Sequence, residues 1–293
     1  MVRSLLRSGI KGRTRLTLFL AGRMRSLQSI PVRIEHGGIV YADLRVSSSH
    51  RLLMDRDWES DEQSVMRRFI EPGNTVFDIG AHIGIHTILL SHLVGPEGSV
   101  FAFEPNTELL PSLEQTISVL PNVTLHKIAL SDETAEGLLV VPGDATMASL
   151  RDWTDGMHGS THNVACELHR LDDMSLRGVL QQPDFIKCDV EGAELLVFRG
   201  GRKMLDRADA PIVLFEANTN SARGFGLPMS AAMDFLASLN ASGYHFFEIE
   251  RGAKLVPVRS LRSNHTNVLA VPDSRIPSIL ATEGEKENAR PSR

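Results

Sequence analysis

The sequence predicts an α/β fold in which helices cover a mostly parallel sheet. Strand-like apolar runs alternate with helix-like segments along most of the chain, a pattern typical of parallel strands joined by helical crossovers. The 293 residues are 42% hydrophobic, enough to bury a large core, and the two cysteines are too few for a disulfide scaffold. We therefore predict one large domain over residues 31–272, between a basic segment (1–30) and a polar tail (273–293).

The first half of this domain is predicted to begin with a hairpin and to continue as alternating helices and strands. The hairpin pairs 32–34 with 39–41 across Gly37-Gly38, and Glu71-Pro72-Gly73 marks the end of the first helix. The predicted elements then follow in the order helix 61–70, strand 75–79, helix 83–93, strand 99–103, helix 107–120 and strand 123–128.

Residues from about 133 to 180 interrupt the alternation. Short strand-like pieces at 137–141 and 164–168, separated by glycines, predict strands and loops inserted after the third strand of the sheet. The alternation then resumes with strand 184–189, helix 193–205, strand 211–216, a helix near 229–239 and the closing strands 244–249 and 267–271.

Charge divides the chain into unequal parts. Residues 1–30 carry seven basic and no acidic side chains, which leaves 24 basic and 36 acidic residues, a net charge of about −12, in the rest. A body this acidic is a poor partner for nucleic acid, so nucleic-acid binding is not expected. The basic segment fits a surface helix, an amphipathic arm on anionic lipid, or an organelle transit peptide. No apolar run is long enough to cross a bilayer, so we expect a cytoplasmic protein with at most peripheral membrane contact, and a disordered tail.

The first motif with chemical content is the stretch 78–84 (DIGAHIG), at a strand-to-helix junction. Gly80 allows a sharp turn, Gly84 allows close approach at the helix start, and the helix N-terminus offers unpaired N–H groups to an anionic ligand. Glu104 follows twenty residues after Gly84, at the end of the next strand. At that position a carboxylate can accept both hydroxyls of a ribose.

This motif favours S-adenosylmethionine over a dinucleotide. A dinucleotide fingerprint requires G-x-G-x-x-G, whereas here three residues, including His82, separate Gly80 from Gly84. Asp78, two residues before Gly80, would repel a pyrophosphate but suits the amino group of a methionine moiety. A nicotinamide-dependent oxidoreductase is therefore the less favoured interpretation.

Four stretches in order resemble the FkbM family of S-adenosylmethionine-dependent methyltransferases. They are DIGAHIGIHT (78–87), FEP (103–105), ALSD (129–132) and IKCDVEGAE (186–194), supported by Trp58-Glu59 and by TNVLAV (266–271). The similarity covers roughly residues 38–272. It implies a Rossmann-like class I methyltransferase fold with helices on both faces of a seven-stranded, mostly parallel sheet whose last strand is antiparallel.

The resemblance also implies a set of cofactor-binding residues. The loop at 78–84, called the glycine loop below, would hold the methionine end of the cofactor. Glu104 would bind its ribose and Asp132 its adenine, although Asp132 is equally well explained as a turn cap. His82 stands where the family pattern leads us to expect asparagine, and its imidazole can still donate a hydrogen bond to a carboxylate. The expected cofactor-binding residues are Asp78, Gly80, Ala81, His82, Gly84, Glu104 and Asp132.

A second acidic group follows the predicted strand 184–189. Asp189 and Glu191 should lie at its carboxyl end, where ligands of open α/β sheets bind. Glu194 is equally well explained as a helix-start residue. Glu216 and Asn218, at the end of the neighbouring strand, could complete an acidic pocket.

Methyl transfer to a hydroxyl requires that its proton be removed. We expect Asp189 or Glu191 to orient the acceptor and one of them, or a histidine, to act as base; His169 is the speculative choice among the histidines. Alternatively, the acids could hold Mg²⁺, although no residue is assigned as a metal ligand. No HExxH or cysteine–histidine cluster indicates zinc.

Together the motifs predict an S-adenosylmethionine-dependent O-methyltransferase. The resemblance adds the acceptor class, a hydroxyl on a sugar, glycolipid or polyketide-like small molecule, which the insertion at 133–180 would select. A catalytically silent module of the same fold, working as an interaction partner, is the alternative from a different class. Binding of S-adenosylhomocysteine would separate the two.

Overall fold

The computed structural model describes residues 19–20, 23–24, 27–34, 37–54, 59–143, 145–156 and 159–276. Most of the basic segment, the tail beyond residue 276 and Trp58 lie outside these ranges, so what the sequence predicts for them stays a prediction. Within the described ranges, none of the helices combines the length and the apolar character needed to cross a bilayer.

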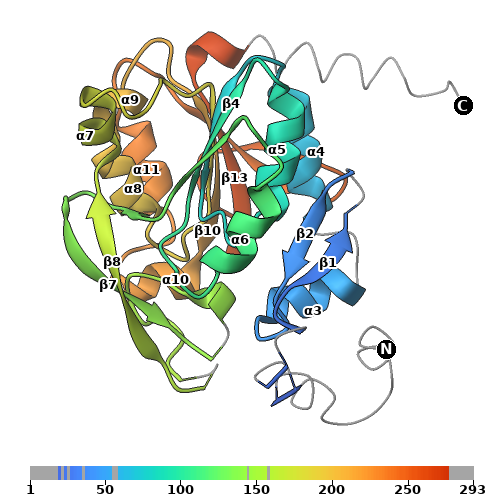
Figure 1. Ribbon diagram of the computed structural model, residues 1–293. Coiled ribbons are helices and arrows are strands. Elements are labelled where there is room, and N and C mark those ends of the chain that lie inside the picture. Colours follow the sequence, from blue (N-terminus) through green and yellow to red (C-terminus); the bar gives the residue numbers. More distant parts are fainter. Residues whose placement is uncertain are drawn as a thin grey trace, which may run out of the picture.

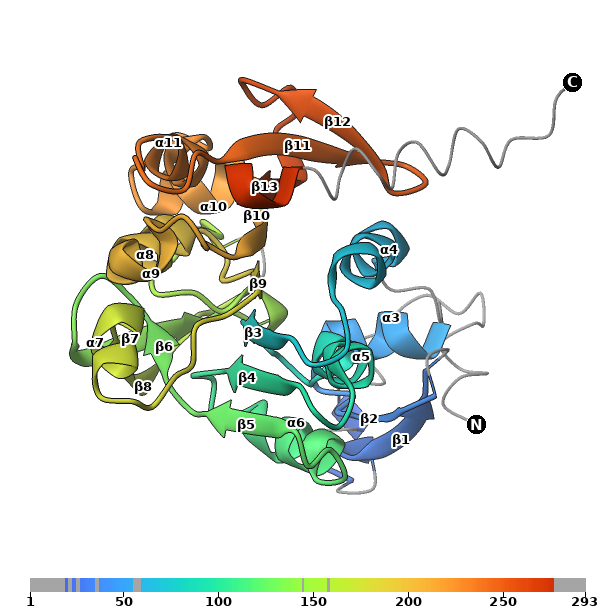
Figure 2. The same ribbon diagram turned by 90° about the horizontal axis from the view of Figure 1, so that it is seen from above.

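The centre of the molecule is an eight-stranded sheet, seen along its strands in Figure 2. Its order is β12 (Lys254–Val258), β11 (His245–Glu250), β13 (His265–Val271), β10 (Ile212–Asn218), β9 (Phe185–Cys188), β3 (Thr75–Ile79), β4 (Ser99–Phe103) and β5 (Val123–His126). The strands from β10 to β5 are parallel, and β13 is antiparallel to β10, as expected. All seven predicted sheet strands are confirmed. The eighth, β12, was not predicted; it contains Pro257, which is tolerated at a sheet edge.

Helices cover both faces of the sheet (Figures 1 and 2). One face carries α4 (Ser60–Phe69) and α5 (Ile85–Val94), and the other α8 (Glu194–Gly200), α9 (Arg202–Leu205) and α11 (Ala231–Ala237). The predicted helix 107–120 is confirmed as the shorter α6 (Leu110–Ile117). Three further helices were not predicted: α3 (Ser47–Met54), α7 (Leu171–Leu176) and α10 (Thr219–Gly224).

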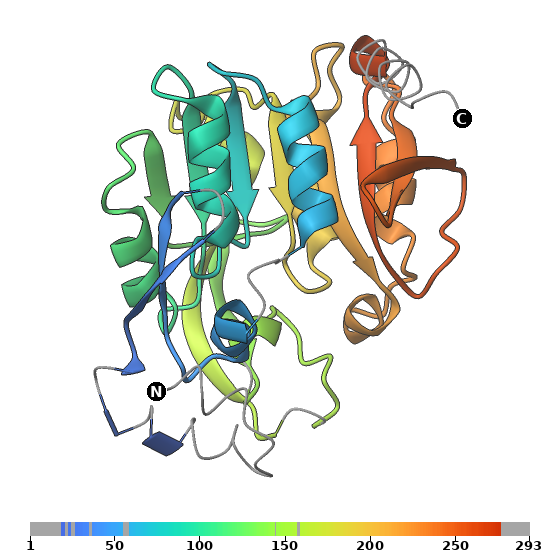
Figure 3. The same cartoon turned by 90° about the vertical axis from the view of Figure 1, so that its right-hand side faces the viewer.

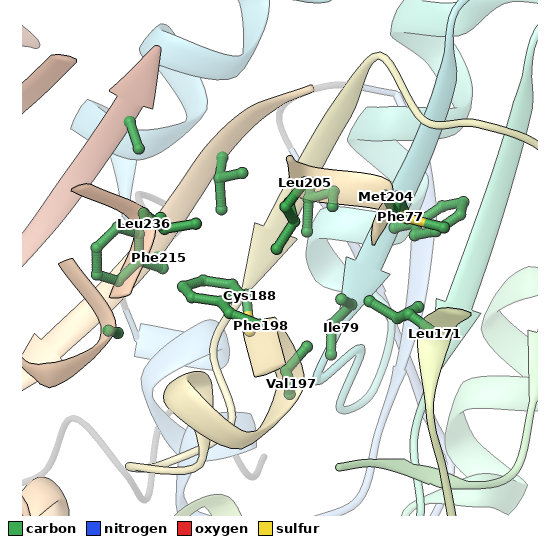
Figure 4. Close-up of a cluster of buried hydrophobic side chains, with 14 of the residues drawn as sticks. Phe77, Ile79, Leu171, Cys188, Val197, Phe198, Met204, Leu205, Phe215 and Leu236 are labelled. Carbon is green, nitrogen blue, oxygen red and sulfur yellow. The ribbon is translucent and has the colours of Figure 1, made fainter. Parts of the chain in front are cut away.

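The main core fills the space between the sheet and α8, α9 and α11. In Figure 4, Ile79 of β3, Phe215 of β10 and Phe198 of α8 belong to the same buried cluster. The predicted helix 193–205 is divided at Gly201, where a Cβ would come within 3.0 Å of the Leu171 side chain. The two consecutive glycines, Gly200 and Gly201, mark the break, and the missing Cβ at Gly201 leaves room for Leu171.

The insertion forms a small sheet of its own. Its strands lie in the order β6 (Ala129–Leu130), β8 (His162–His169) and β7 (Ala135–Val141), with β7 and β8 antiparallel, which confirms the predicted pieces 137–141 and 164–168. The predicted N-terminal hairpin is likewise confirmed as β1 (Ile30–Arg33) and β2 (Ile39–Ala42). In Figure 3 the parallel strands of the main sheet point toward the end of the molecule where the insertion lies. Both sheets thus meet at the ligand-binding edge expected for this fold.

Gly84 allows α5 to pack against α6. Gly84 has φ 89°, and a Cβ there would lie 2.9 Å from Thr116 Cγ2 and 3.0 Å from Leu113 Cδ1. Gly73 has the same φ of 89°, but a Cβ there would meet no described atom within 4 Å. The two sites therefore share the backbone strain of a left-handed residue and differ in steric overlap.

Gly84→Ala is therefore expected to cost more stability than Gly73→Ala. Both should lose about 1–2 kcal/mol to the left-handed conformation, and Gly84→Ala about 1–3 kcal/mol more because its methyl overpacks the α5–α6 contact. Urea unfolding of the two variants measures the difference. Equal losses would show that the contact with α6 is loose.

Candidate active site

A cavity of about 360 Å³ opens at the carboxyl ends of β3, β4, β9 and β10. This volume lies in the range of small-molecule sites. The strand ends form one wall, with Ile79, Phe103, Lys187 and Glu216 each contributed by a different strand. The insertion forms another wall, through Leu139 of β7, residues 146–150 and Trp153.

The glycine loop passes directly over the end of β9. Gly80 has φ 81°, and a Cβ there would lie only 1.9 Å from the Asp189 carbonyl oxygen, so the close approach requires glycine. Ala81 and His82 follow it along the cavity wall. His82 has φ 55°, a left-handed conformation in which asparagine and histidine are both enriched, so the replacement of the expected asparagine is conformationally mild.

Glu104 is held at the end of β4 by two backbone groups. Its Oε2 accepts a hydrogen bond from the His82 N–H and its Oε1 from the Asn106 N–H, both at 2.8 Å. Burial raises the pKa of Glu104 to about 7, against the opposing effect of these hydrogen bonds. The carboxylate lines the cavity next to the glycine loop, so its spare lone pairs are available to hydroxyl groups of a ligand.

Asp78 lies behind the cavity wall rather than on it. It is fully buried, accepts a hydrogen bond from the Thr87 hydroxyl at 2.6 Å, and has Oδ1 3.9 Å from Lys187 Nζ. Burial raises the pKa of Asp78 above its ordinary value. The immediate partners of the Asp78 carboxylate are thus the Thr87 hydroxyl and the Lys187 ammonium, and it does not line the cavity.

Three other predicted residues also lie away from the cavity wall. Gly84 packs against α6, Asp132 has its Oδ2 3.9 Å from Arg199 Nη1, and His169 makes a 3.0 Å hydrogen bond with Glu167. The backbone before Asp132 does reach the cavity, through Ala129 and Leu130.

Lys187, for which no role was predicted, links the glycine loop to the acidic residues. Its Nζ donates to the Gly80 carbonyl at 3.2 Å and lies 3.5 Å from Asp189 Oδ2. Burial alone would lower the pKa of Lys187, but the carboxylates of Asp189 and Asp78 outweigh burial and hold this pKa above its ordinary value. The sequence did contain a signal for a special role of this residue, because Lys187 is the one charged residue in the otherwise apolar strand β9.

Three carboxylates converge where β9 and β10 end. Asp189, Glu191 and Glu216 each offer an oxygen, and these oxygens lie within 4.8 Å of one another. Burial and the Glu216 carboxylate raise the pKa of Glu191 well above its ordinary value, and burial also raises that of Glu216. Such a group can attract a cation, a metal ion included, or accept hydrogen bonds from hydroxyls.

Two side chains from distant segments complete this acidic region. His265, at the start of β13, bonds through Nε2 to Glu216 Oε1 at 2.5 Å, and this hydrogen bond raises the pKa of His265. Glu59, before α4, also lines the cavity, and burial and the Asp189 charge raise its pKa to about 8. Glu194 instead accepts from the Val190 and Gly192 N–H groups and closes the turn that precedes α8.

Comparison with known proteins identifies the family. The FkbM methyltransferase domain model matches residues 78–250. The hexuronic acid methyltransferase AglP of Haloferax volcanii is 26% identical over 72% of this chain and 84% of that protein. The 2-O-methyltransferase NoeI of Sinorhizobium fredii is 24% identical over 57% of this chain and 73% of its own length. Among solved structures, an S-adenosylmethionine-dependent O-methyltransferase of Thermotoga maritima has a TM-score of 0.37 and 13% identity over 73% of this chain and 65% of its own. The resemblance carried by the motifs is thus confirmed: the chain belongs to the FkbM family of S-adenosylmethionine-dependent methyltransferases.

Proposed function

We propose that this enzyme methylates a hydroxyl group of an uncharged sugar, glycolipid or polyketide-like acceptor. The observation that carries the proposal is the group of three carboxylates, Asp189, Glu191 and Glu216, in the wall of the cavity that also contains the glycine loop. One relative is named for a hexuronic acid, which supports a sugar-like acceptor, and another for 2-O-methylation, which supports oxygen as the methylated atom.

The charge of the cavity favours a neutral acceptor. Among the described residues that line it, Lys187 is the single lysine or arginine, against five acidic side chains, Glu59, Glu104, Asp189, Glu191 and Glu216. Burial raises the pKa of Glu59, Glu104, Glu191 and Glu216, so at a pH above these raised values their carboxylates would repel an anionic acceptor. We therefore expect a neutral sugar, rather than a uronic acid, to be the better substrate.

We propose that the cofactor binds between the glycine loop and Glu104, which line the same cavity. Its ribose would meet the Glu104 carboxylate, and its adenine the apolar wall of Phe103, Ile128 and Leu130. When bound, S-adenosylmethionine supplies a methyl group already activated by a positively charged sulfur. We propose that Asp78 contributes indirectly, by pairing with Lys187, while contacts of Gly84 and Asp132 with the cofactor stay predictions.

The acidic group would then orient the acceptor and receive its proton. Asp189 or Glu191 takes the proton from the hydroxyl, and the Lys187 ammonium, 3.5 Å from Asp189 Oδ2, helps to hold the Asp189 side chain in place. Holding the hydroxyl in line with the methyl group supplies much of the acceleration. His169 stays a predicted base whose present hydrogen bond is to Glu167.

Mass spectrometry of reaction products tests the proposed function. The full chain is incubated with S-adenosylmethionine and a panel of neutral methyl glycosides, and with the corresponding methyl glucuronide. We expect one added methyl group on a hydroxyl of at least one neutral glycoside, and less on the glucuronide. Methylation confined to amines, or no transfer together with no calorimetric binding of S-adenosylhomocysteine, would contradict the proposal and favour the silent module.

A divalent cation on the same carboxylates is the second arrangement to consider. The spacing of Asp189, Glu191 and Glu216 within 4.8 Å and their oxygen ligands suit Mg²⁺, which could polarise the acceptor hydroxyl. Because Lys187 already supplies positive charge beside Asp189, we expect methyl transfer to persist in excess chelator. Loss of transfer in chelator, with recovery on addition of Mg²⁺, would favour the metal arrangement.

Glu104→Gln is expected to weaken binding of S-adenosylhomocysteine about tenfold or more at pH 8, because a charged hydrogen-bond acceptor is lost. The pKa of Glu104 in the free protein is about 7. The ionised form accepts hydrogen bonds from hydroxyls more strongly, so wild-type affinity should rise as the pH increases through 7 and then level off. Calorimetry from pH 6 to pH 8 measures both effects. The control Glu97→Gln, in the exposed turn before β4, should retain the wild-type profile, and the same retention in Glu104→Gln would contradict the assignment.

The remaining proposals concern the location of the enzyme in the cell and its contacts with membranes and nucleic acid. We propose a cytoplasmic location, contact of residues 1–30 with anionic lipid, and no nucleic-acid partner, on the strength of the charge distribution alone. Binding of the full chain to vesicles with and without anionic lipid tests the membrane contact.

A further inference from the structure

Trp153 is a buried aromatic residue whose single polar side-chain atom, Nε1, is unsatisfied within the described part of the chain. The residue is 8% exposed, and its Nε1 donates no hydrogen bond to any residue that the structure describes. A buried N–H group without a partner costs about 1–3 kcal/mol, so such groups are nearly always satisfied by protein, water or ligand. Trp153 lines the cavity, and its Nε1 has almost no accessible surface, so a ligand there can supply the missing acceptor atom after a small rotation of the indole.

The position of Trp153 is fixed by α10. A Cβ added at Gly224, the last residue of α10, would lie 2.5 Å from Trp153 Cβ and 3.0 Å from its Cα. The main-chain side of Trp153 therefore packs tightly on this helix, and the indole is the part left to line the cavity. The next residue, Thr154, donates to Asp152 Oδ1 from both its N–H and its hydroxyl, at 3.0 and 2.9 Å, which fixes the turn.

Trp153 lines the same cavity as the acidic residues at the ends of β9 and β10. α10 follows directly after β10, whose Glu216 and Asn218 line the same cavity. The Ser149 hydroxyl donates to the Glu191 carbonyl at 2.8 Å, so the loop that carries Trp153 is tied to the loop that carries the candidate base. Glu216 Oε2 is a second buried polar atom that has no hydrogen-bond partner among the described residues. Two residues of the cavity wall thus carry a buried donor and a buried acceptor that no described protein group uses. Once a small side-chain rotation exposes them, they suit neighbouring oxygens of a polyol.

We propose that Trp153 is a specificity-determining residue for the acceptor. Its Nε1–H donates to an acceptor oxygen adjacent to the hydroxyl that is methylated, and its ring packs on the CH face of the sugar. This inference rests on the proposed function, because it requires an acceptor that carries oxygens on neighbouring carbons. Trp153 would act on acceptor recognition and leave cofactor binding unchanged.

The test compares wild type with Trp153→Phe, which keeps an aromatic ring and removes the N–H. The probe is the neutral methyl glycoside that wild type methylates best, together with its deoxy analogue lacking the hydroxyl next to the methylation site. For wild type we expect about a tenfold preference for the glycoside over the analogue, and for Trp153→Phe a rise of about tenfold in KM with loss of that preference. The affinity for S-adenosylhomocysteine should stay within about twofold, since no cofactor contact is removed.

A spectroscopic measurement on the wild type covers the case of a poorly folded variant. The chain has two tryptophans, Trp58 and Trp153, so its ¹⁵N–¹H spectrum contains two indole signals, and the one that remains in Trp58→Phe belongs to Trp153. With S-adenosylhomocysteine bound, the Trp153 signal should move when the glycoside is added. An unmoved signal, or an unchanged KM and preference in Trp153→Phe, would overturn the role of Trp153 alone. If wild type methylates no glycoside, both this inference and the proposed function fail.

Discussion

Asp189→Asn is expected to lower kcat by roughly 10²–10⁴-fold, the usual contribution of a positioned general base. The amide keeps the shape of the side chain but cannot take the proton of the acceptor hydroxyl. Asp189 lines the cavity, with its Oδ2 held 3.5 Å from Lys187 Nζ. Because we propose that this residue contacts the acceptor, the affinity for S-adenosylhomocysteine should change by less than about threefold, which is well under one hydrogen bond.

Two further variants serve as a control and as a test of the other candidate base. Asp209→Asn is the matched control, since Asp209 is an exposed acid whose partner is Arg207 and which lies outside the cavity wall. Glu191→Gln tests the other candidate base in the same assay. Unchanged turnover in Asp189→Asn, with cofactor affinity retained, would remove Asp189 from the mechanism. A large loss in Glu191→Gln alone would move the base to that residue.

The central sheet could be predicted because its strands are continuous apolar runs bounded by turns. Segments 75–79 and 99–103 are almost entirely buried, and burial on both faces of a sheet is what such runs indicate. The edge strand β12 depends on its pairing with β11. No local pattern carries that information.

The residues of the candidate site could be predicted where their place at the end of a strand determines their position. They could not be predicted where a contact between two side chains determines it. Glu104, Asp189 and Glu191 line the cavity because residues that follow parallel strands meet at one edge. Asp78 also ends a strand, but the register of β3 against β9 places it opposite Lys187, and its carboxylate is turned into that pair. The sequence shows both residues and gives no sign that they are partners.

The positions of Trp153 and His265 illustrate the same limit. One lies in the insertion and the other at the start of β13, so each reaches the cavity only through the folded arrangement. Neither stands in one of the motifs that carry the family resemblance. Residues that select the acceptor are expected in such segments, since loops vary while the sheet that positions them is retained.

Lys187→Met should have the largest effect on stability, a loss of about 3–5 kcal/mol, because it leaves a buried charge without its partner. Asp78 is fully buried and 3.9 Å from the Lys187 ammonium, and burial already raises the pKa of Asp78. An acid whose pKa is raised by folding costs stability when it is ionised, so the loss in Lys187→Met should grow as the pH rises above the unfolded-state pKa. Urea unfolding at pH 5 and pH 8 measures this trend.

The double variant Asp78→Asn/Lys187→Met separates lost pairing from lost packing. The asparagine side chain carries no charge that needs a partner, and its amide oxygen can still accept from the Thr87 hydroxyl, as the Asp78 carboxylate does. Removing both charges should therefore restore at least about 2 kcal/mol of the single variant's loss. Lys127→Met is the control, because Lys127 is half exposed, its pair with Glu114 is at the surface, and such pairs contribute about 0–1 kcal/mol.

Additive losses in the double variant would mean that Lys187 stabilises the fold through its aliphatic stem or through Asp189. In that case Asp78 would have to be explained by its hydrogen bond with Thr87 alone. The pairing of Asp78 with Lys187 would then contribute nothing measurable to stability, and the contact of Lys187 with Asp189 would be the pairing that matters.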